Sequence, residues 1–107
     1  MIFQLGTALL DACVLSILIN NDTYGYILTQ NVKKVISISE STLYPVLRRL
    51  QKEGNLETYD KSIQGRNRRY YKITDSGKEQ LEEYKKEWID YKEQVDKIIF
   101  GRLEEDE

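Results

Sequence analysis

The chain has 107 residues, a formal net charge of −2, one cysteine and no histidine. This length corresponds to one domain, which can bury only a modest hydrophobic core. Because the commonest general base and metal ligand is absent, and a lone cysteine cannot form a zinc site, we expect neither an enzyme nor a metal or cofactor site. The single cysteine and the lack of a basic leader before the first apolar segment favour a cytoplasmic location.

The charge is unevenly distributed along the chain. Residues 39–74 contain eight basic and four acidic side chains, whereas residues 75–107 contain six basic and twelve acidic ones. Proteins that bind nucleic acid through their whole surface are usually basic throughout, and this chain is not. A basic segment within an acidic chain instead indicates one local surface that contacts DNA phosphates.

Two helices are predicted in the first third of the chain. Residues 4–20 are apolar on nearly every face, which indicates a helix that is buried on most sides. A second helix is expected to extend to about residue 35, with either Asp22 or Thr23 as its N-cap. The apolar residues Tyr24, Ile27, Leu28 and Val32 would form its inner face.

A third helix is predicted from Ser39 to Glu53. Ser39 is a favourable N-cap, and Gly54 supplies the left-handed conformation that commonly ends a helix. Pro45 is unfavourable within a helix, so the helix is expected to start no earlier than Ser39, and a bend at residues 41–42 is possible. Its core face is expected to contain Leu43, Val46, Leu47 and Leu50.

A β-hairpin is predicted after the third helix, with strands at Leu56–Ile63 and Arg68–Ile73. Tyrosine and isoleucine residues favour strand formation in both segments. Residues 64–67 would form the loop, in which Gly65 and Asn67 can adopt positive φ angles. Because side chains alternate along a strand, Arg68 and Arg69 are expected on opposite faces.

A long last helix is predicted after Thr74, which can serve as its N-cap. A helix of about 25 residues spans roughly 38 Å, which exceeds what a domain of this size can cover. We therefore expect this helix to pair with a second copy, although the apolar seam could instead pack on the chain's own first helix. The seam residues have heptad a/d spacing: Leu81, Tyr84, Trp88, Tyr91, Val95 and Ile98.

The order of three helices followed by a hairpin predicts a winged helix-turn-helix, a mainly α fold with a small β-wing. Residues 1–74 would form the DNA-binding domain, and residues 75–107 the dimerisation helix and acidic tail. The third helix would enter the major groove and the hairpin would contact the backbone or minor groove. Of Arg48 and Arg49, at least one is expected to reach a phosphate, while the other can flank the core. The candidate DNA-binding residues are Ser41, Thr42, Tyr44, Arg48, Arg49, Lys61, Gln64, Arg66, Arg68 and Arg69.

Four segments resemble the PadR family of bacterial transcriptional regulators, in its compact group with one C-terminal helix. The segments are TYGYIL, STLYPVLRRLQKEG, GRNRRYYKIT and DSGKEQL, and the resemblance extends from about Leu9 to Ile99. It implies a cytoplasmic homodimer that binds a palindromic operator, usually as a repressor. It also implies that first-helix residues of the partner, with Leu5 among them, join the last helix in the dimer interface.

The resemblance further implies a possible effector site. In relatives that sense drugs or phenolic compounds, the ligand lies at the dimer interface and a tryptophan of the last helix stacks against it. Trp88 corresponds to that tryptophan, but it could equally be an anchor of the dimer core. For Asp11, three roles are considered, in descending order: a helix cap, a solvent-exposed residue or a partner of a cationic ligand. The candidate pocket consists of Leu5, Ala8, Asp11, Ala12, Leu15, Tyr84 and Trp88.

Two other functions are consistent with the sequence. The first is a winged-helix module that binds another protein and no DNA, although such a module has no need of an arginine-rich hairpin. The second is a ligand-carrying dimer whose main site is aromatic, formed by Trp88 with Tyr84 and Tyr91.

Overall fold

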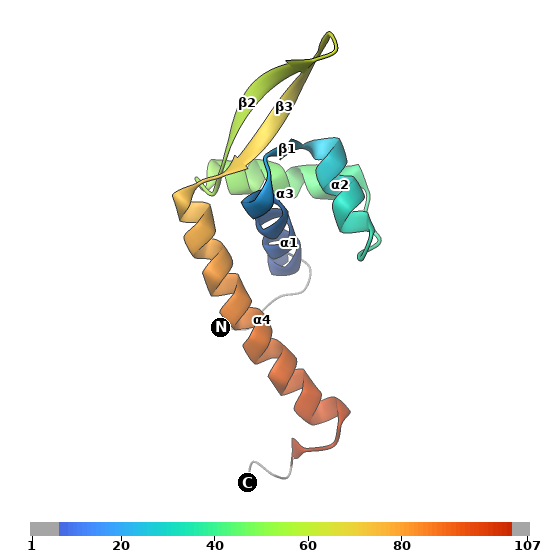
Figure 1. Ribbon diagram of the computed structural model, residues 1–107. Helices are drawn as coiled ribbons and strands as arrows, with labels where there is room; N and C mark the ends of the chain where they lie inside the picture. The colour runs from blue at the N-terminus through green and yellow to red at the C-terminus, as the bar shows by residue number, and fades with distance from the viewer. Residues whose placement is uncertain (1–6, 104–107) are drawn as a thin grey trace.

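The computed structural model describes residues 7–103, which form a mainly helical fold with a small antiparallel sheet (Figure 1). The elements are α1 (Thr7–Asn20), β1 (Thr23–Tyr24), α2 (Gly25–Lys33), α3 (Glu40–Lys52), β2 (Leu56–Ile63), β3 (Arg66–Ile73) and α4 (Asp75–Ile99). The β2–β3 hairpin projects from one side of the helices and α4 extends away on the other, so the molecule measures 63 × 27 × 21 Å. The predicted winged helix-turn-helix fold is confirmed.

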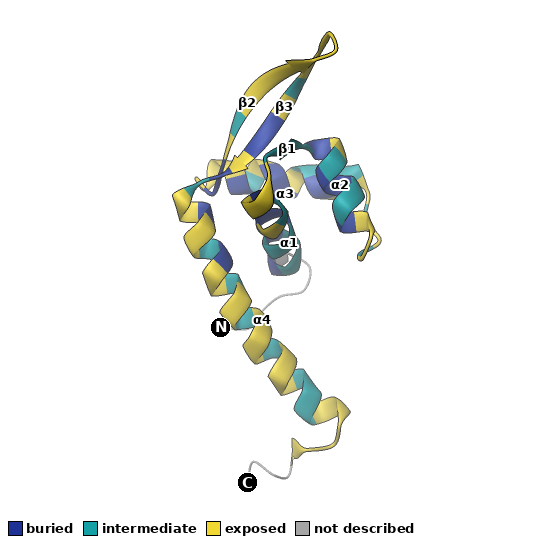
Figure 2. Cartoon of the chain, viewed as in Figure 1, coloured by how far each residue is buried: buried dark blue, intermediate teal, exposed yellow. Residues whose placement is uncertain are grey.

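The hydrophobic core lies where α1, α2 and α3 meet the base of the sheet (Figure 2). The predicted inner face of α3 is confirmed, because Leu43, Val46, Leu47 and Leu50 are all buried. Leu81 adds the first turns of α4 to the same core. The C-terminal half of α4 and the tip of the hairpin contribute no buried residues. The fold therefore leaves two extended elements outside its core.

The segment before α2 forms a short strand that the sequence did not predict. Thr23 and Tyr24 pair with Tyr71 and Tyr70 of β3, which makes the sheet order β1-β3-β2. Tyr24 therefore occupies the N-cap position of α2, without a side-chain capping bond, and the predicted cap at Asp22 or Thr23 is wrong. Pairing with the free edge of β3 outweighed the local capping preference, because an unpaired strand edge offers backbone hydrogen bonds.

The hairpin turn is tighter than predicted. Ile63 pairs directly with Arg66, so the turn consists of Gln64 and Gly65, with φ angles of 52° and 78°. Two consecutive residues with positive φ are typical of a type I′ turn, whose twist matches that of the flanking strands. Asn67 therefore lies within β3, opposite Ser62, and has no positive φ angle, so the predicted loop of residues 64–67 is wrong.

The ends of α3 largely follow the sequence prediction. Ser39 is at the N-cap position, but its hydroxyl contacts Ser41 and Thr42 instead of a backbone N–H. The helix is continuous from Glu40 to Lys52, so Pro45 in its second turn does not end it. Proline at this position removes the one backbone hydrogen bond that would run to the carbonyl four residues earlier. Gly54 has a φ angle of 83° and ends the helix as predicted.

The start of α4 is held tightly against the sheet. The Thr74 hydroxyl accepts a hydrogen bond from the Gly77 backbone N–H at 3.0 Å, which confirms the predicted N-cap. A β-carbon at Gly77 would overlap the backbone carbonyl of Asn55, so only glycine fits at this contact. This close approach fixes the direction in which α4 leaves the core.

Candidate nucleic-acid interface

The first turn of α3 presents a cluster of hydroxyl groups to solvent. Ser41 and Thr42 are exposed, and the Ser39 hydroxyl lies 2.9 Å from that of Ser41 and 3.3 Å from that of Thr42. Hydroxyl groups both donate and accept, so they can contact either phosphates or base edges. The first turn of α3 thus has the polar character that a DNA-recognition helix needs.

Tyr44 is partly buried between α3 and the start of α2. Its hydroxyl donates to Glu40 at 3.1 Å, and burial together with this hydrogen bond raises the pKa of Tyr44. A β-carbon at Gly25 would overlap the Tyr44 ring, so the glycine of the TYGYIL segment allows the ring to lie against α2. This contact sets how α3 sits relative to the helix that precedes it.

Arg48 and Arg49 are oriented differently. Arg48 is exposed, whereas Arg49 is partly buried and forms an ion pair with Asp11 of α1. The Arg49 guanidinium also contacts Glu53 at 3.4 Å. The hydrogen bond with Asp11 raises the pKa of Arg49, so the Arg49 guanidinium remains protonated. Of the two, Arg49 is the one that flanks the core, and Arg48 is the arginine available for a phosphate.

The hairpin has one aromatic face and an exposed tip. Tyr59 and Tyr70 stack across the strands with ring centroids 5.6 Å apart, and Tyr24 lies 5.5 Å from Tyr70. The Arg68 guanidinium lies 4.5 Å from the Tyr24 ring, and the Lys61 ammonium lies 5.3 Å from the Tyr70 ring. Cation–π contacts of this kind orient a cation without neutralising it.

The remaining hairpin candidates, Gln64, Arg66 and Arg69, are exposed. Arg68 therefore differs from Arg66 and Arg69 in being partly buried and stacked on a tyrosine. The hydroxyl of Tyr59 donates to Asp22 at 2.7 Å, which ties the hairpin to the segment before β1. The aromatic face is thus engaged in packing and holds Arg68, whereas Arg66 and Arg69 remain exposed.

A hollow of about 260 Å³ with a mixed polar and aromatic lining lies between the hairpin and the helices. It is lined by Tyr44 of α3, Arg68 and Arg69 of β3, and Tyr26 at the start of α2, among others. The structure therefore brings Tyr44 and two hairpin arginines together although they are more than twenty residues apart in sequence. Tyr26 was not among the predicted site residues, although it belongs to the TYGYIL segment and is half exposed.

Groups of side chains suited to holding a metal ion do not occur within residues 7–103. Among the helices in that part of the chain, none is long and apolar enough to cross a membrane.

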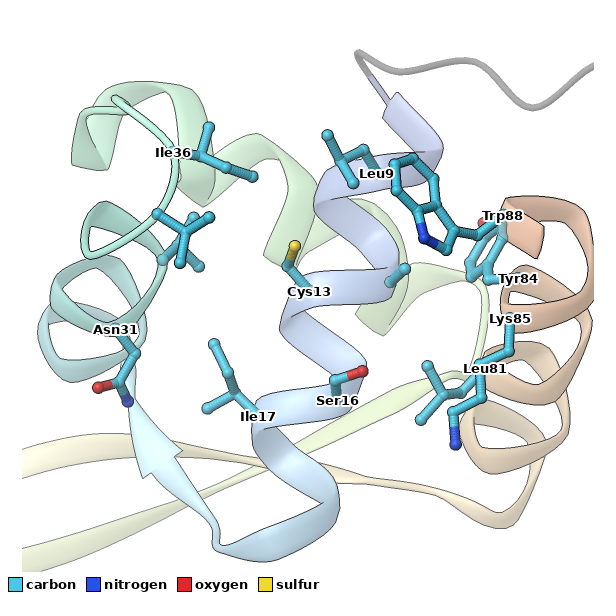
Figure 3. Close-up of a pocket in the computed structure, with 13 residues that line it drawn as sticks. Leu9, Cys13, Ser16, Ile17, Asn31, Ile36, Leu81, Tyr84, Lys85 and Trp88 are labelled. Atoms are coloured by element: carbon cyan, nitrogen blue, oxygen red, sulfur yellow. The ribbon is translucent and has the colours of Figure 1, made fainter. Parts of the chain in front are cut away.

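An apolar groove of about 400 Å³ lies between α1, the end of α2 and α4 (Figure 3). Trp88 and Tyr84 of α4 border it on one side, and Cys13 and Ile17 of α1 form its floor. Ile36 and neighbouring residues close the opposite side. Burial raises the pKa of the Cys13 thiol, so it remains protonated and unreactive at neutral pH.

The groove includes only part of the predicted effector pocket. Ala12, Tyr84 and Trp88 line it, whereas Ala8 and Leu15 are buried in the interior. Leu5 lies outside the described residues. The difference arises from helix geometry, because Ala8 and Leu15 lie on the face of α1 that is turned away from the groove.

Asp11 differs from all three roles that the sequence suggested. It is 1% exposed, pairs with Arg49, and accepts a hydrogen bond from the Tyr84 hydroxyl at 2.8 Å. It neither caps a helix nor faces solvent, and it does not line the groove. The sequence reasoning missed this arrangement because Arg49 and Tyr84 are 38 and 73 residues away.

The comparison with protein families matches residues 14–83 to the Transcriptional regulator PadR-like family. The chain belongs to this family. Its members are transcription regulators and not enzymes.

Crystal structures of relatives agree with this assignment. The protein smu.1704 from Streptococcus mutans UA159 is 44% identical, with a TM-score of 0.85 over 96% of this chain and 97% of that one. A PadR-like transcriptional regulator from Bacillus cereus is 37% identical, with a TM-score of 0.80 over 90% of this chain and 96% of that one. Bacillus subtilis PadR in complex with operator DNA is 30% identical, with a TM-score of 0.64 over 71% of this chain and 46% of that one.

In this PadR-family chain, the seam of α4 is buried only near its start. Leu81 lies in the core and Tyr84 packs beside it, whereas Trp88 remains 39% exposed. Further along, Ile98 and Phe100 are each 65% exposed, and Tyr91 and Val95 are partly buried. The seam therefore packs on the chain's own core in its first turns, while its second half leaves large apolar side chains in contact with water.

Proposed function

We propose that this PadR-family regulator binds a palindromic operator as a homodimer and represses transcription. The observation that supports this most directly is the hollow that Tyr44 of α3 lines together with Arg68 and Arg69 of the hairpin. A recognition helix and a basic wing on one face are what a winged helix-turn-helix uses to bind duplex DNA. The operator complex of the Bacillus subtilis relative supports the same function.

In this proposal α3 lies in the major groove with Ser41 and Thr42 near base edges. Arg48 contacts a phosphate. Five hairpin side chains, four cations and one amide, contact the backbone or minor groove: Lys61, Gln64, Arg66, Arg68 and Arg69. Residues 1–74 form the DNA-binding part and residues 75–107 the dimerisation helix and tail, in a protein that acts in the cytoplasm. Two-fold symmetry would separate the recognition helices by about 34–36 Å, one turn of DNA.

Dimerisation is proposed from the exposed second half of α4. Burying each large apolar side chain contributes about 1.5–3 kcal/mol, so a second copy covering Trp88, Ile98 and Phe100 would gain several kcal/mol. The interface would contain the seam residues Leu81, Tyr84, Trp88, Tyr91, Val95 and Ile98, with Leu5 from the partner. Mass measurement of the purified protein by light scattering should give twice the chain mass of 12.6 kDa.

The function is tested by titrating the protein onto labelled DNA from upstream of its own gene over a series of salt concentrations. Each phosphate that a cation neutralises contributes about −0.9 to the slope of log affinity against log salt, so a slope of roughly −4 to −8 is expected. A dimer that binds no such DNA at low salt would contradict the proposal. That result would favour the alternative of a winged-helix protein-interaction module.

A small aromatic effector is proposed for the apolar groove that Trp88 borders. Flat aromatic compounds that enter the groove should quench the fluorescence of Trp88, which is the single tryptophan of the chain. Such a compound would release DNA only if it binds the DNA-free arrangement more tightly. Quenching that leaves operator affinity unchanged would indicate a ligand-carrying dimer whose site is independent of DNA. Absence of quenching by a panel of planar aromatic cations and phenols would contradict the effector site.

A further inference from the structure

Asp11 connects two helices that have different tasks in the proposed function. One carboxylate oxygen of Asp11 accepts a hydrogen bond from the Arg49 guanidinium of α3, and the other accepts from the Tyr84 hydroxyl of α4 at 2.8 Å. The carboxylate is almost fully buried, so it depends on these partners. A buried carboxylate without partners strongly destabilises a fold, which makes the geometry of all three side chains interdependent.

Both partners are held in the form that the network requires. The hydrogen bond from Arg49 to Asp11 raises the pKa of Arg49, and the guanidinium therefore remains a cation. Burial and the hydrogen bond to Asp11 raise the pKa of Tyr84, so its hydroxyl remains a neutral donor. Glu53, the C-cap residue of α3, contacts the same guanidinium at 3.4 Å from the exposed side.

The position of α1 explains why one residue can connect α3 with α4. Helix α1 packs against both (Figure 1), and Asp11 lies in its second turn. The DNA-recognition helix and the dimerisation helix are thus joined by a rigid, charged bridge as well as by apolar packing. Charge-assisted hydrogen bonds have stricter geometry than apolar contacts, so they fix the angle between helices more closely.

We propose that Asp11 is a positioning residue for DNA binding, which sets the angle of α3 relative to α4 through Arg49 and Tyr84. The inference rests on the proposed function, in which α4 joins the two copies. In such a dimer, any rotation of α3 about α1 occurs in both copies and changes the separation of the two recognition helices. A palindromic operator presents its half-sites at a fixed spacing, so a changed separation weakens binding.

The direction of the change in DNA affinity distinguishes this proposal from a simple electrostatic effect. DNA phosphates repel acidic side chains, so neutralising an acid should by itself strengthen DNA binding. A positioning role predicts the opposite for Asp11. It also predicts that Arg49, although it is an arginine of the recognition helix, makes no contribution to the salt dependence of binding.

The experiment compares Asp11→Asn, Tyr84→Phe and Arg49→Met with the wild-type protein on one operator duplex. Each variant should bind about 3- to 30-fold more weakly, the range found when a coupling network is cut. Their salt slopes should equal the wild-type slope. Arg48→Met should instead make the slope shallower by about one, as expected for a lost phosphate contact. Asp90→Asn, the same substitution at an exposed position of α4, should bind at least as tightly as the wild type.

Tyr84→Phe is the most informative variant because it removes one hydroxyl and retains the ring, so its fold should persist. Thermal unfolding is measured for every variant, and binding is compared well below each midpoint temperature. A residue that merely stabilises the fold would lower the midpoint and leave the affinity of the folded protein unchanged, which would overturn the proposal. Equal or tighter binding by Asp11→Asn, or a shallower salt slope for Arg49→Met, would also overturn it.

Failure of the proposed function is recognisable separately, because the wild-type protein would then bind no DNA. Amide hydrogen exchange of the DNA-free protein tests the network in that case. Faster exchange in α3 for Tyr84→Phe, whose substitution is in α4, would support the coupling between the two helices. Exchange in α3 that equals the wild-type rate would overturn it.

Discussion

Replacing Arg66 and Arg68 together by alanine should weaken operator binding by about 100-fold at low salt. A hydrogen bond to a charged group contributes about 1.5–3 kcal/mol, so each lost arginine contact corresponds to roughly tenfold or more. The salt slope should become shallower by about two, one unit for each lost phosphate contact. Fluorescence anisotropy with a labelled operator over a salt series measures both quantities.

The two arginines should also be distinguishable from each other. Arg66 is exposed next to the hairpin turn, whereas Arg68 is stacked on the Tyr24 ring at 4.5 Å. Tyr24→Leu removes this stacking partner and retains the Arg68 charge, so it should weaken binding with an unchanged salt slope. As a control, Lys78→Ala with Lys86→Ala removes two exposed cations from α4 and should leave the affinity nearly unchanged. If the hairpin double variant binds like the wild type, the hairpin does not contact DNA.

Replacing Val95 by glutamate should convert the proposed dimer into monomers at micromolar concentration. Val95 is at an a position of the α4 seam, and two-fold pairing would bury a carboxylate in each copy. Burying an unpaired charge costs several kcal/mol, so dimerisation should weaken by at least about 100-fold. Monomers lose the effective concentration that links two half-sites, so operator affinity should fall by roughly 10²- to 10⁴-fold. Sedimentation velocity and operator titration measure the two effects.

Gln94→Glu is the matched control for this substitution. It adds the same charge at the preceding residue, which is exposed and lies outside the seam. The protein should remain dimeric and should bind the operator at close to wild-type affinity. A Val95→Glu protein that stays dimeric would place the dimer interface elsewhere on the chain. A monomeric variant with unchanged operator affinity would instead contradict the need for two half-sites.

The order and type of the main helices and of the hairpin could be predicted because local patterns determine them. The 3, 4, 7 spacing of leucines in α3 and the stop at Gly54 depend on neighbours within a few residues. The same holds for the Thr74 cap of α4. The predicted cap of α2 was wrong because a distant segment competed with a local preference. Thr23 and Tyr24 became a strand because the free edge of β3, almost fifty residues later, offered backbone partners.

The candidate site, like the fold, could be predicted from the sequence only in part. Sequence composition alone located the basic segment, the hydroxyl cluster at the start of α3 and the aromatic seam of α4, because these depend on residue type and spacing. Tertiary structure alone decided that Arg48 faces outward while Arg49 faces Asp11, although the two arginines are adjacent. The physical reason is that a buried carboxylate requires a cation, and only the packing of α1 between α3 and α4 determines which cation can reach it.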